Sequence, residues 1–316
     1  MGLDSYINTY GAACKARFGQ KVKKLTIDAK FTCPNRDGTL GRGGCTFCNV
    51  SSFSHEAGTD LGISEQISQG KFRQRDRQAK GLGNNKDAAN DKYIAYFQAY
   101  TSTYDEYALL KARYDEAIKD EHIVGLAVGT RPDCVPDAVI ELLADYQDKG
   151  LEVWLELGLQ TANEQTLKRI NRGHGWQEYA DTVARARRAG IKVCTHLILG
   201  LPGETHQDYM QTLTQVLELG IDGLKIHPLH IVEGSTMAKA WRSDKLTIMA
   251  LEDYAFSVGE MIRATPKHII YHRVAAYAQR PMLLAPDWCS RRWDAMVAIE
   301  DNLREFGGQG QALRSD

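Results

Sequence analysis

The feature that most constrains the fold is a regular alternation of strand-like and helix-like segments along the chain. Helical patterns cover residues 136–149, 163–170, 177–189 and 205–219, and glycine directly follows three of these four. The β-rich runs lie before and between them, at residues 22–28, 93–100, 123–129, 151–157, 191–199 and 223–227. Several runs are almost continuously apolar, which is typical of parallel strands covered by helices. The alternation predicts an α/β fold built from parallel βαβ units.

Six such units are too few for a closed eight-stranded barrel, so the pattern fits an open doubly wound sheet or a partial barrel. In both folds, the chemistry belongs at the C-terminal ends of the strands. After about residue 230 the rhythm changes, with a helix near 251–265 and a strand near 268–272. We therefore predict an N-terminal extension, a main α/β unit, a smaller α+β region and a frayed tail, at residues 1–20, 21–230, 231–306 and 307–316.

Bulk composition argues against some classes of function. The net charge is −1 and 43% of the residues are hydrophobic, so nothing global indicates binding to nucleic acid or to an anionic membrane. No secretion signal and no apolar run of about 18 residues stand out. We expect a cytoplasmic protein, in which clustered cysteines are metal ligands or catalytic groups more often than disulfides.

Three of the seven cysteines lie close together in residues 33–48, CPNRDGTLGRGGCTFC. Cys33, Cys45 and Cys48 could bind zinc with His55 as the fourth ligand. They could also hold a [4Fe–4S] cluster with one iron left open. Because the loop follows the first predicted strand, where parallel sheets build active sites, its position favours the catalytic cluster.

The motifs together resemble the radical S-adenosylmethionine (SAM) superfamily. The resemblance spans nearly the whole chain and is carried by CPNRDGTLGRGGCTFCN, YFQAYTSTY, VGTRPDCVPD, WLELGLQT, RINRGH, HLILGLPGET and HPLHIV. It is strongest to the bacterial YhcC family, which is related to the Elongator catalytic subunit and to oxygen-independent coproporphyrinogen oxidases. The cysteine spacing departs from the commonest Cys-x3-Cys-x2-Cys, and the longer first gap is typical of this branch.

The resemblance implies a radical SAM enzyme on a partial (β/α)6 TIM-like barrel with a small C-terminal α+β extension. Cys33, Cys45 and Cys48 would hold a [4Fe–4S] cluster, and SAM would bind its open iron. Reductive cleavage of SAM would then give a 5′-deoxyadenosyl radical that abstracts hydrogen from a substrate. Such an enzyme is oxygen-sensitive and needs an external one-electron donor, such as flavodoxin or ferredoxin.

The same resemblance implies the residues that contact SAM. Arg172 would reach the carboxylate of SAM, Gln160 would contact SAM, and His196 would face the ribose. A Gly-Gly-Glu motif that many relatives use for the amino group is absent here, and polar residues at the second strand exit would replace it. These residues are Gln98, Thr101 and Ser102, while Phe47 would shield the cluster beside the adenine. Glu156, in a predicted buried strand, needs a polar partner, and Arg131 at the third strand exit could orient SAM or substrate.

The substrate remains open between tRNA and a small molecule. Residues 285–293 combine Trp288 and Trp293 with arginines, as in elements that stack bases and meet phosphates, and a small metabolite could instead lie under the same tryptophans. Cys289, in the same segment, is a candidate donor of a hydrogen atom to the substrate radical. A third hypothesis is a zinc site on a non-catalytic binding module.

Overall fold

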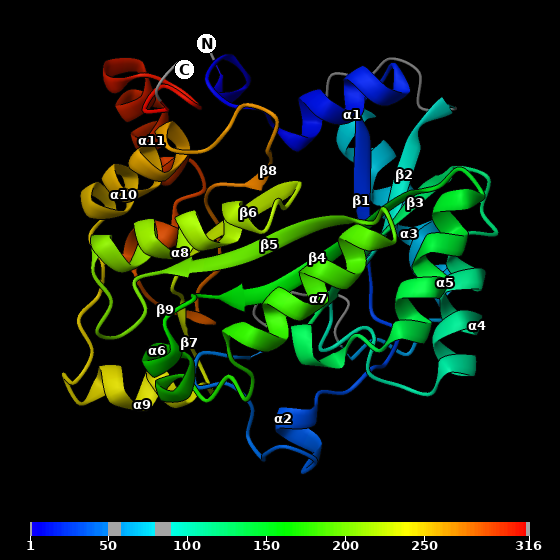
Figure 1. Ribbon diagram of the computed structural model, residues 1–316, viewed down its shortest axis with the longest axis horizontal. Coiled ribbons are helices and arrows are strands. Elements are labelled where there is room, and N and C mark those ends of the chain that lie inside the picture. Colours follow the sequence, from blue (N-terminus) through cyan, green and yellow to red (C-terminus); the bar gives the residue numbers. More distant parts are fainter. Residues whose placement is uncertain (1, 50–57, 80–89, 314–316) are drawn as a thin grey trace.

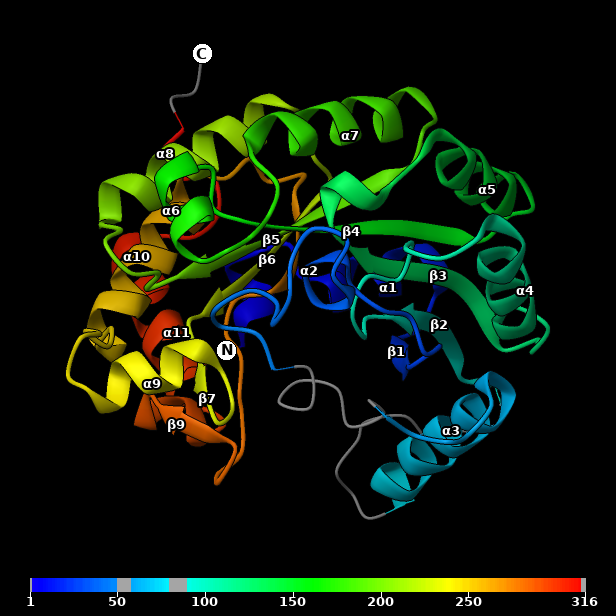
Figure 2. The same ribbon diagram turned by 90° about the horizontal axis from the view of Figure 1, so that it is seen from below.

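The computed structural model describes residues 2–49, 58–79 and 90–313. Its main sheet has seven parallel strands in sequence order, from β1 to β6 and then β8. They are β1 (Val22–Ile27), β2 (Lys92–Phe97), β3 (Ile123–Thr130), β4 (Glu152–Gln160), β5 (Lys192–Leu199), β6 (Gly223–Pro228) and β8 (Ile270–Arg273). The sheet curls into a half-barrel, as Figure 2 shows. The α/β partial barrel expected from the sequence is confirmed, and the six predicted strands are all present.

One predicted element has a different role. The strand expected near residues 268–272 was placed in the C-terminal region, but β8 pairs with β6 and extends the main sheet. Helix α10 (Leu251–Arg263) connects the two strands, so this is a further βαβ crossover. The sheet therefore has a seventh strand beyond the six units expected, and it continues past residue 230. Without β8, the edge of β6 opposite β5 would lack a hydrogen-bonded partner strand.

Helices cover the outer face of the curled sheet (Figures 1 and 2). The helix α7 (Trp176–Arg188) shows why, since Tyr179, Val183 and Ala186 recur at helical spacing and are all fully buried. The other helices packed along the barrel are α3 (Ile63–Ala79), α4 (Tyr107–Ala117), α5 (Asp137–Asp148), α6 (Glu164–Arg169) and α8 (His206–Glu218). The main core lies between these helices and the sheet.

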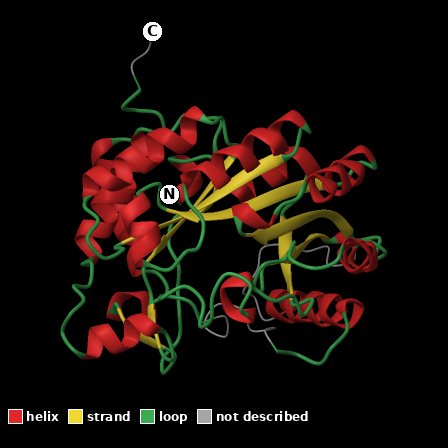
Figure 3. Cartoon of the chain, turned by 60° about the horizontal axis from the view of Figure 1, so that its bottom comes forward, coloured by secondary structure: helices red, strands yellow, loops and turns green. Residues whose placement is uncertain are grey.

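A smaller unit follows the sixth strand. Strands β7 (Ile231–Val232) and β9 (Leu283–Ala285) form an antiparallel pair, seen apart from the main sheet in Figure 3. Helices α9 (Thr236–Arg242) and α11 (Asp294–Phe306) and the 3-10 turn η5 (Asp287–Ser290) complete this region. None of the helices in the described ranges combines the length and apolar character that a membrane span requires.

The two ends of the chain pack together, as Figure 1 shows. The N-terminal 3-10 turn η1 (Leu3–Ser5) precedes α1 (Tyr10–Phe18), and Thr9 forms an isolated parallel bridge to Tyr271 on β8. Residues 307–316 were expected to fray, but residues 307–313 are held in place. The Gln309 side chain is buried, accepts a hydrogen bond from Asn8 N at 2.7 Å and donates to the Pro266 carbonyl at 2.7 Å.

Candidate active site

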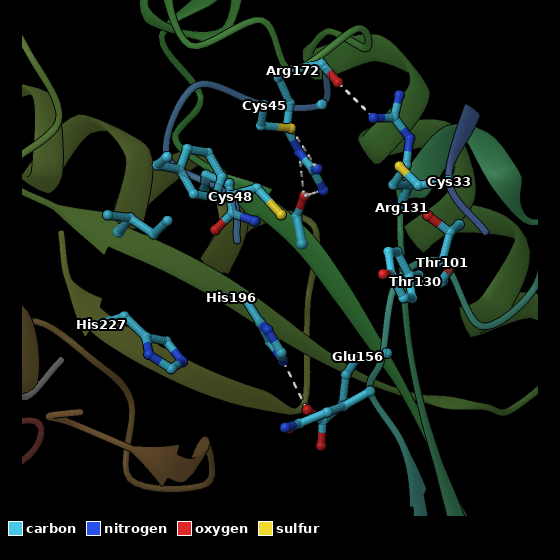
Figure 4. Close-up of a pocket in the computed structure, with 18 of the residues that line it drawn as sticks. Cys33, Cys45, Cys48, Thr101, Thr130, Arg131, Glu156, Arg172, His196 and His227 are labelled. Atoms are coloured by element: carbon cyan, nitrogen blue, oxygen red, sulfur yellow. Dashed lines mark hydrogen bonds and ion pairs between the residues drawn. The ribbon is translucent and has the colours of Figure 1, made fainter. Parts of the chain in front are cut away.

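One cavity opens at the C-terminal ends of the parallel strands. It brings together nine of the residues expected from the sequence to bind the cluster or SAM: Cys33, Cys45, Phe47, Cys48, Gln98, Thr101, Gln160, Arg172 and His196. Figure 4 shows the cysteines at one end of this cavity and Glu156, His196 and His227 toward the other. The topology explains the convergence, because successive parallel strands deliver their C-terminal ends to one rim.

The cysteine loop is held in shape by hydrogen bonds of its own. Cys33 precedes the short helix α2 (Pro34–Asp37), and Asn35 donates from Nδ2 to the Asn171 carbonyl at 2.8 Å and to the Arg172 carbonyl at 2.9 Å. Gly44 has a φ of +82°, and a Cβ there would lie 2.9 Å from Arg36 Nε, so this turn needs glycine. These contacts dock the loop against the segment that follows α6.

Hydrogen-bond donors surround the sulfur atoms. Arg172 Nη1 lies 3.5 Å from Cys45 Sγ, and Asn35 Nδ2 lies 3.6 Å from the same sulfur. Arg36 donates from Nη2 to the Cys48 carbonyl at 2.9 Å. Burial, together with the nearby Cys45, raises the pKa of the Cys48 thiol. Three thiols facing one cavity, with positive and N–H groups beside them, suit a thiolate-bound cluster, since such donors stabilise charge on sulfur.

Arg131 lines the cavity and supports the Arg172 segment. Its guanidinium forms a two-point ion pair with Asp133, at 3.0 and 2.7 Å, and donates from Nη1 to the Arg172 carbonyl at 2.7 Å. Asp133 lies in the 3-10 turn η4 (Pro132–Cys134) that follows β3. Arg172 in turn donates from Nε to the Gly158 carbonyl at 3.2 Å, at the end of β4. The chain of contacts fixes the Arg172 guanidinium between the cysteine loop and the sheet.

Two predicted residues lie elsewhere. Ser102 is fully buried outside the cavity lining, and its hydroxyl donates to the Ala99 carbonyl at 3.4 Å. Cys289 is 2% exposed and belongs to the main hydrophobic core, where burial raises the pKa of its thiol. Cys289 does not line the cavity, so the predicted role as a hydrogen-atom donor stays a prediction without structural support. His55 lies outside the described residues.

The two tryptophans near Cys289 also separate. Trp288 is buried, packs against Tyr254 with ring centroids 5.2 Å apart and donates from Nε1 to the Met249 carbonyl at 3.1 Å. Trp293 is 64% exposed and stacks with Arg292. Neither lines the cavity. The positions of the two rings therefore give no support to the hypothesis that they close the barrel mouth over a small molecule, since one ring belongs to the core and the other is exposed.

A buried polar network that the sequence only hinted at forms the deep end of the cavity. Glu156 on β4 is fully buried and accepts hydrogen bonds from Tyr96 at 2.8 Å, from His196 Nε2 at 2.8 Å and from Lys225 at 3.1 Å. It also pairs with Lys24 on β1 and lies 3.3 Å from His272 Nδ1 on β8. The sequence predicted one polar partner for Glu156, and the structure gives it several, each on a different strand of the sheet.

The charges in this network are set by their neighbours. Burial alone opposes ionisation of Glu156, but Lys225 and Lys24 outweigh it and hold the pKa of Glu156 well below its usual range. Burial lowers the pKa of Lys225 to about 8, against the opposing pull of Glu156. Burial and the charge of Lys225 lower the pKa of His196 to about 4. At neutral pH the network therefore holds an ionised Glu156 carboxylate, a Lys225 ammonium group and a neutral His196 imidazole.

Comparison with known proteins adds independent support. Residues 37–216, which make up more than half of the chain, match the sequence pattern of the radical SAM superfamily. The chain belongs to the radical SAM superfamily. Residues 221–305 of the chain match the radical SAM C-terminal domain family. Enzymes of this superfamily use a [4Fe–4S] cluster and SAM, so membership decides in favour of the cluster and against a zinc-binding module without activity.

The relatives extend over different parts of this radical SAM protein. Protein YhcC of Escherichia coli (strain K12) is 54% identical over 313 residues, covering 99% of this chain and 97% of the relative. A tRNA uridine(34) acetyltransferase of Dehalococcoides mccartyi is 32% identical over 127 residues, covering 39% of this chain and 27% of the relative. The solved structure of the Elp3 protein of Methanocaldococcus infernus, with an N-terminal deletion, shares the fold at 15% identity and a TM-score of 0.61, covering 90% of this chain and 63% of that one.

Proposed function

We propose that this radical SAM protein cleaves SAM reductively and uses the 5′-deoxyadenosyl group to abstract a hydrogen atom from a substrate bound in the same cavity. The observation that carries the proposal is the convergence of Cys33, Cys45 and Cys48 with Arg172 and Gln160 on one cavity that continues to the buried Glu156 network. The site proposed for the cluster and SAM is therefore continuous with a polar space that can hold a substrate.

Each residue has a defined part in this proposal. The three cysteines hold the cluster, which when bound supplies the electron that breaks the sulfonium bond. Arg172 pairs with the SAM carboxylate, and Gln98 and Thr101 receive its amino group. Phe47 covers the adenine side, where it packs on the apolar cluster with Leu229 and Ile231. The electron comes from an external one-electron donor such as flavodoxin or ferredoxin.

His196 is poised to accept a hydrogen bond from the ribose. Its ring is neutral at pH 7 because burial lowers its pKa to about 4. Its Nε2 lies 2.8 Å from the ionised Glu156 and must carry the proton to donate to that carboxylate. The other ring nitrogen, Nδ1, is then a hydrogen-bond acceptor, which suits a ribose hydroxyl. Glu156 thus orients His196 instead of contacting SAM.

The second part of the proposal is that the substrate is tRNA. The alternative is that the substrate is a small metabolite. The matching tRNA uridine(34) acetyltransferase supports RNA, and so does Tyr100, a cavity-lining ring that is 39% exposed and available to stack on a base. Binding of unmodified tRNA that weakens with rising salt would support this substrate. Equal affinity for tRNA at low and high salt, or no binding, would favour the metabolite.

The test of the proposed chemistry is anaerobic. The protein is reconstituted with iron and sulfide, reduced with dithionite and given SAM, and 5′-deoxyadenosine is measured together with iron content. We expect 5′-deoxyadenosine and about four irons per chain, as one [4Fe–4S] cluster requires. Bound zinc without 5′-deoxyadenosine would contradict the proposal and leave only the fold in common with the superfamily.

A further inference from the structure

The wall of the cavity made by β6 and β8 carries more positive charge than its surroundings neutralise. We propose that this wall binds an anionic group of the substrate, a carboxylate or a phosphate, through Lys225, Arg273, His227 and His230. The inference rests on the proposed function in taking this end of the cavity as the substrate end.

The strand register places these side chains side by side. Lys225 on β6 pairs with His196 on β5 and with Arg273 on β8, so three neighbouring strands present one row of nitrogen-bearing side chains. His227 follows Lys225 by two residues and lines the same cavity, as the alternation of a strand requires. His230 comes from the loop after β6 and lines it too. The four residues thus form a continuous patch, here called the β6–β8 wall.

The carboxylate that could neutralise the charge of this wall, Glu156, already pairs with other residues. Among the described residues that line the cavity, Glu156 is the one carboxylate, and it is shared by Lys24, Lys225 and His196. The Arg273 side chain lines the cavity, and the residue is exposed to solvent. This side chain makes no hydrogen bond or ion pair with any described residue, although it lies close enough to Lys225 and His227 to disfavour their protonated forms. A solvent-accessible guanidinium that lines a cavity without a carboxylate partner can bind an anion.

A second observation points to a ligand at the same wall. Nε2 of His230 is buried and has no hydrogen-bond partner among the described residues. Leaving a buried polar atom unpaired costs about 1–3 kcal/mol, so a ligand that pairs with it gains that contact. Burial lowers the pKa of His230 to about 4, and burial with the charge of Arg273 lowers the pKa of His227 well below its usual range. A bound anion would favour the protonated form of both imidazoles and so raise their pKa values.

The site is separate from the SAM carboxylate. Arg172 lies beside Cys45 at the cluster end of the cavity, whereas His196 and His227 lie at the other end, as Figure 4 shows. Two cations with two imidazoles match the two or three oxygens of a carboxylate or a phosphate. Both ligands share this chemistry, and the experiment separates them.

The experiment measures binding of inorganic phosphate and of acetate to the reconstituted protein with SAM present, by anaerobic calorimetry. Native protein and Arg273→Gln are compared with Arg292→Gln, which removes the same charge from a surface arginine stacked on Trp293. We expect one anion per chain and a loss of about tenfold or more in affinity for Arg273→Gln, as charge-assisted hydrogen bonds predict. Arg292→Gln should bind like the native protein, and Arg273→Lys should recover part of the affinity.

The outcomes are distinct. Preferential binding of phosphate identifies a phosphorylated group, and preferential binding of acetate identifies a carboxylate. Failure of both anions to bind, or native affinity in Arg273→Gln, overturns the inference. Because this readout needs no turnover, anion binding without 5′-deoxyadenosine would contradict only the proposed reaction, and 5′-deoxyadenosine without anion binding would contradict only the β6–β8 wall.

Discussion

Arg172 Nη1 lies 3.5 Å from the Cys45 sulfur. The same guanidinium donates a hydrogen bond from Nε to the Gly158 carbonyl. The backbone carbonyl of Arg172 accepts hydrogen bonds from the side chains of Asn35 and Arg131. We propose that this fixed cation binds the carboxylate of SAM. Its rigidity reduces the entropy lost when SAM binds.

Replacing Arg172 with Gln should weaken SAM binding while leaving iron in place. We expect a loss of about tenfold or more in SAM affinity, since a charge-assisted hydrogen bond contributes about 1.5–3 kcal/mol. Anaerobic calorimetry with reconstituted protein measures it, alongside iron content. The matched control is Arg169→Gln, because Arg169 donates to the Pro202 carbonyl outside the cavity lining. Unchanged SAM affinity in Arg172→Gln would remove this residue from the SAM site.

If the three cysteines are the cluster ligands, as proposed, alanine at Cys33, Cys45 or Cys48 should abolish retention of the cluster, because each thiolate would bind a different iron. Iron and sulfide content after anaerobic reconstitution is the measurement. Cys289→Ala is the control, since that thiol is buried in the core away from the cavity. It should keep native iron content. Native iron in any of the three loop variants would show that the residue is not a ligand.

Glu156→Gln should destabilise the fold strongly. Removing the carboxylate leaves Lys24 and Lys225 facing each other without their shared counter-charge, and unpaired buried charges cost about 3–5 kcal/mol. Urea unfolding of the apoprotein at pH 7 measures the change, with the exposed Glu141→Gln as control. Adding Lys225→Met should return part of the lost stability. A double variant less stable than Glu156→Gln would argue against charge imbalance as the cause.

Glu204 gives a pH-dependent prediction. Burial raises its pKa from 4.5 to about 7, although it accepts a hydrogen bond from Thr161 at 2.5 Å. Between these two pH values the unfolded chain has lost the proton that the folded chain keeps, so stability falls as pH rises and the penalty is complete above pH 7. Glu204→Gln avoids this penalty and keeps an oxygen that Thr161 can donate to.

We therefore expect Glu204→Gln to stabilise the protein by on the order of 2 kcal/mol at pH 8 and by little at pH 5. Urea unfolding at the two pH values measures this, and Glu218→Gln at the exposed end of α8 serves as control. An equal effect of Glu204→Gln at both pH values would show that the carboxyl titrates normally.

Local sequence patterns predicted much of the barrel and the cluster loop. Apolar runs with intervening amphipathic segments and terminal glycines identify β1 to β6 and the helices between them, because strand and helix periodicity are local properties. The cysteine spacing after the first strand likewise places the three candidate metal ligands at the C-terminal edge of the sheet. The same local signals did not reveal that the strand at 270–273 pairs with β6 in the main sheet, since periodicity does not say which strand is its neighbour.

The sequence alone thus determined the class of fold, the loop with its three cysteines and the superfamily. Tertiary structure decided which distant side chains share one space. Glu156 meets Lys24, His196, Lys225 and His272 from four other strands, and Cys289 turns into the core although its neighbours look like a binding element. The reason is physical: the pairing and register of parallel strands fix contacts across more than a hundred residues, and hydrophobic burial, which is not directional, fixes which face of a short turn points inward.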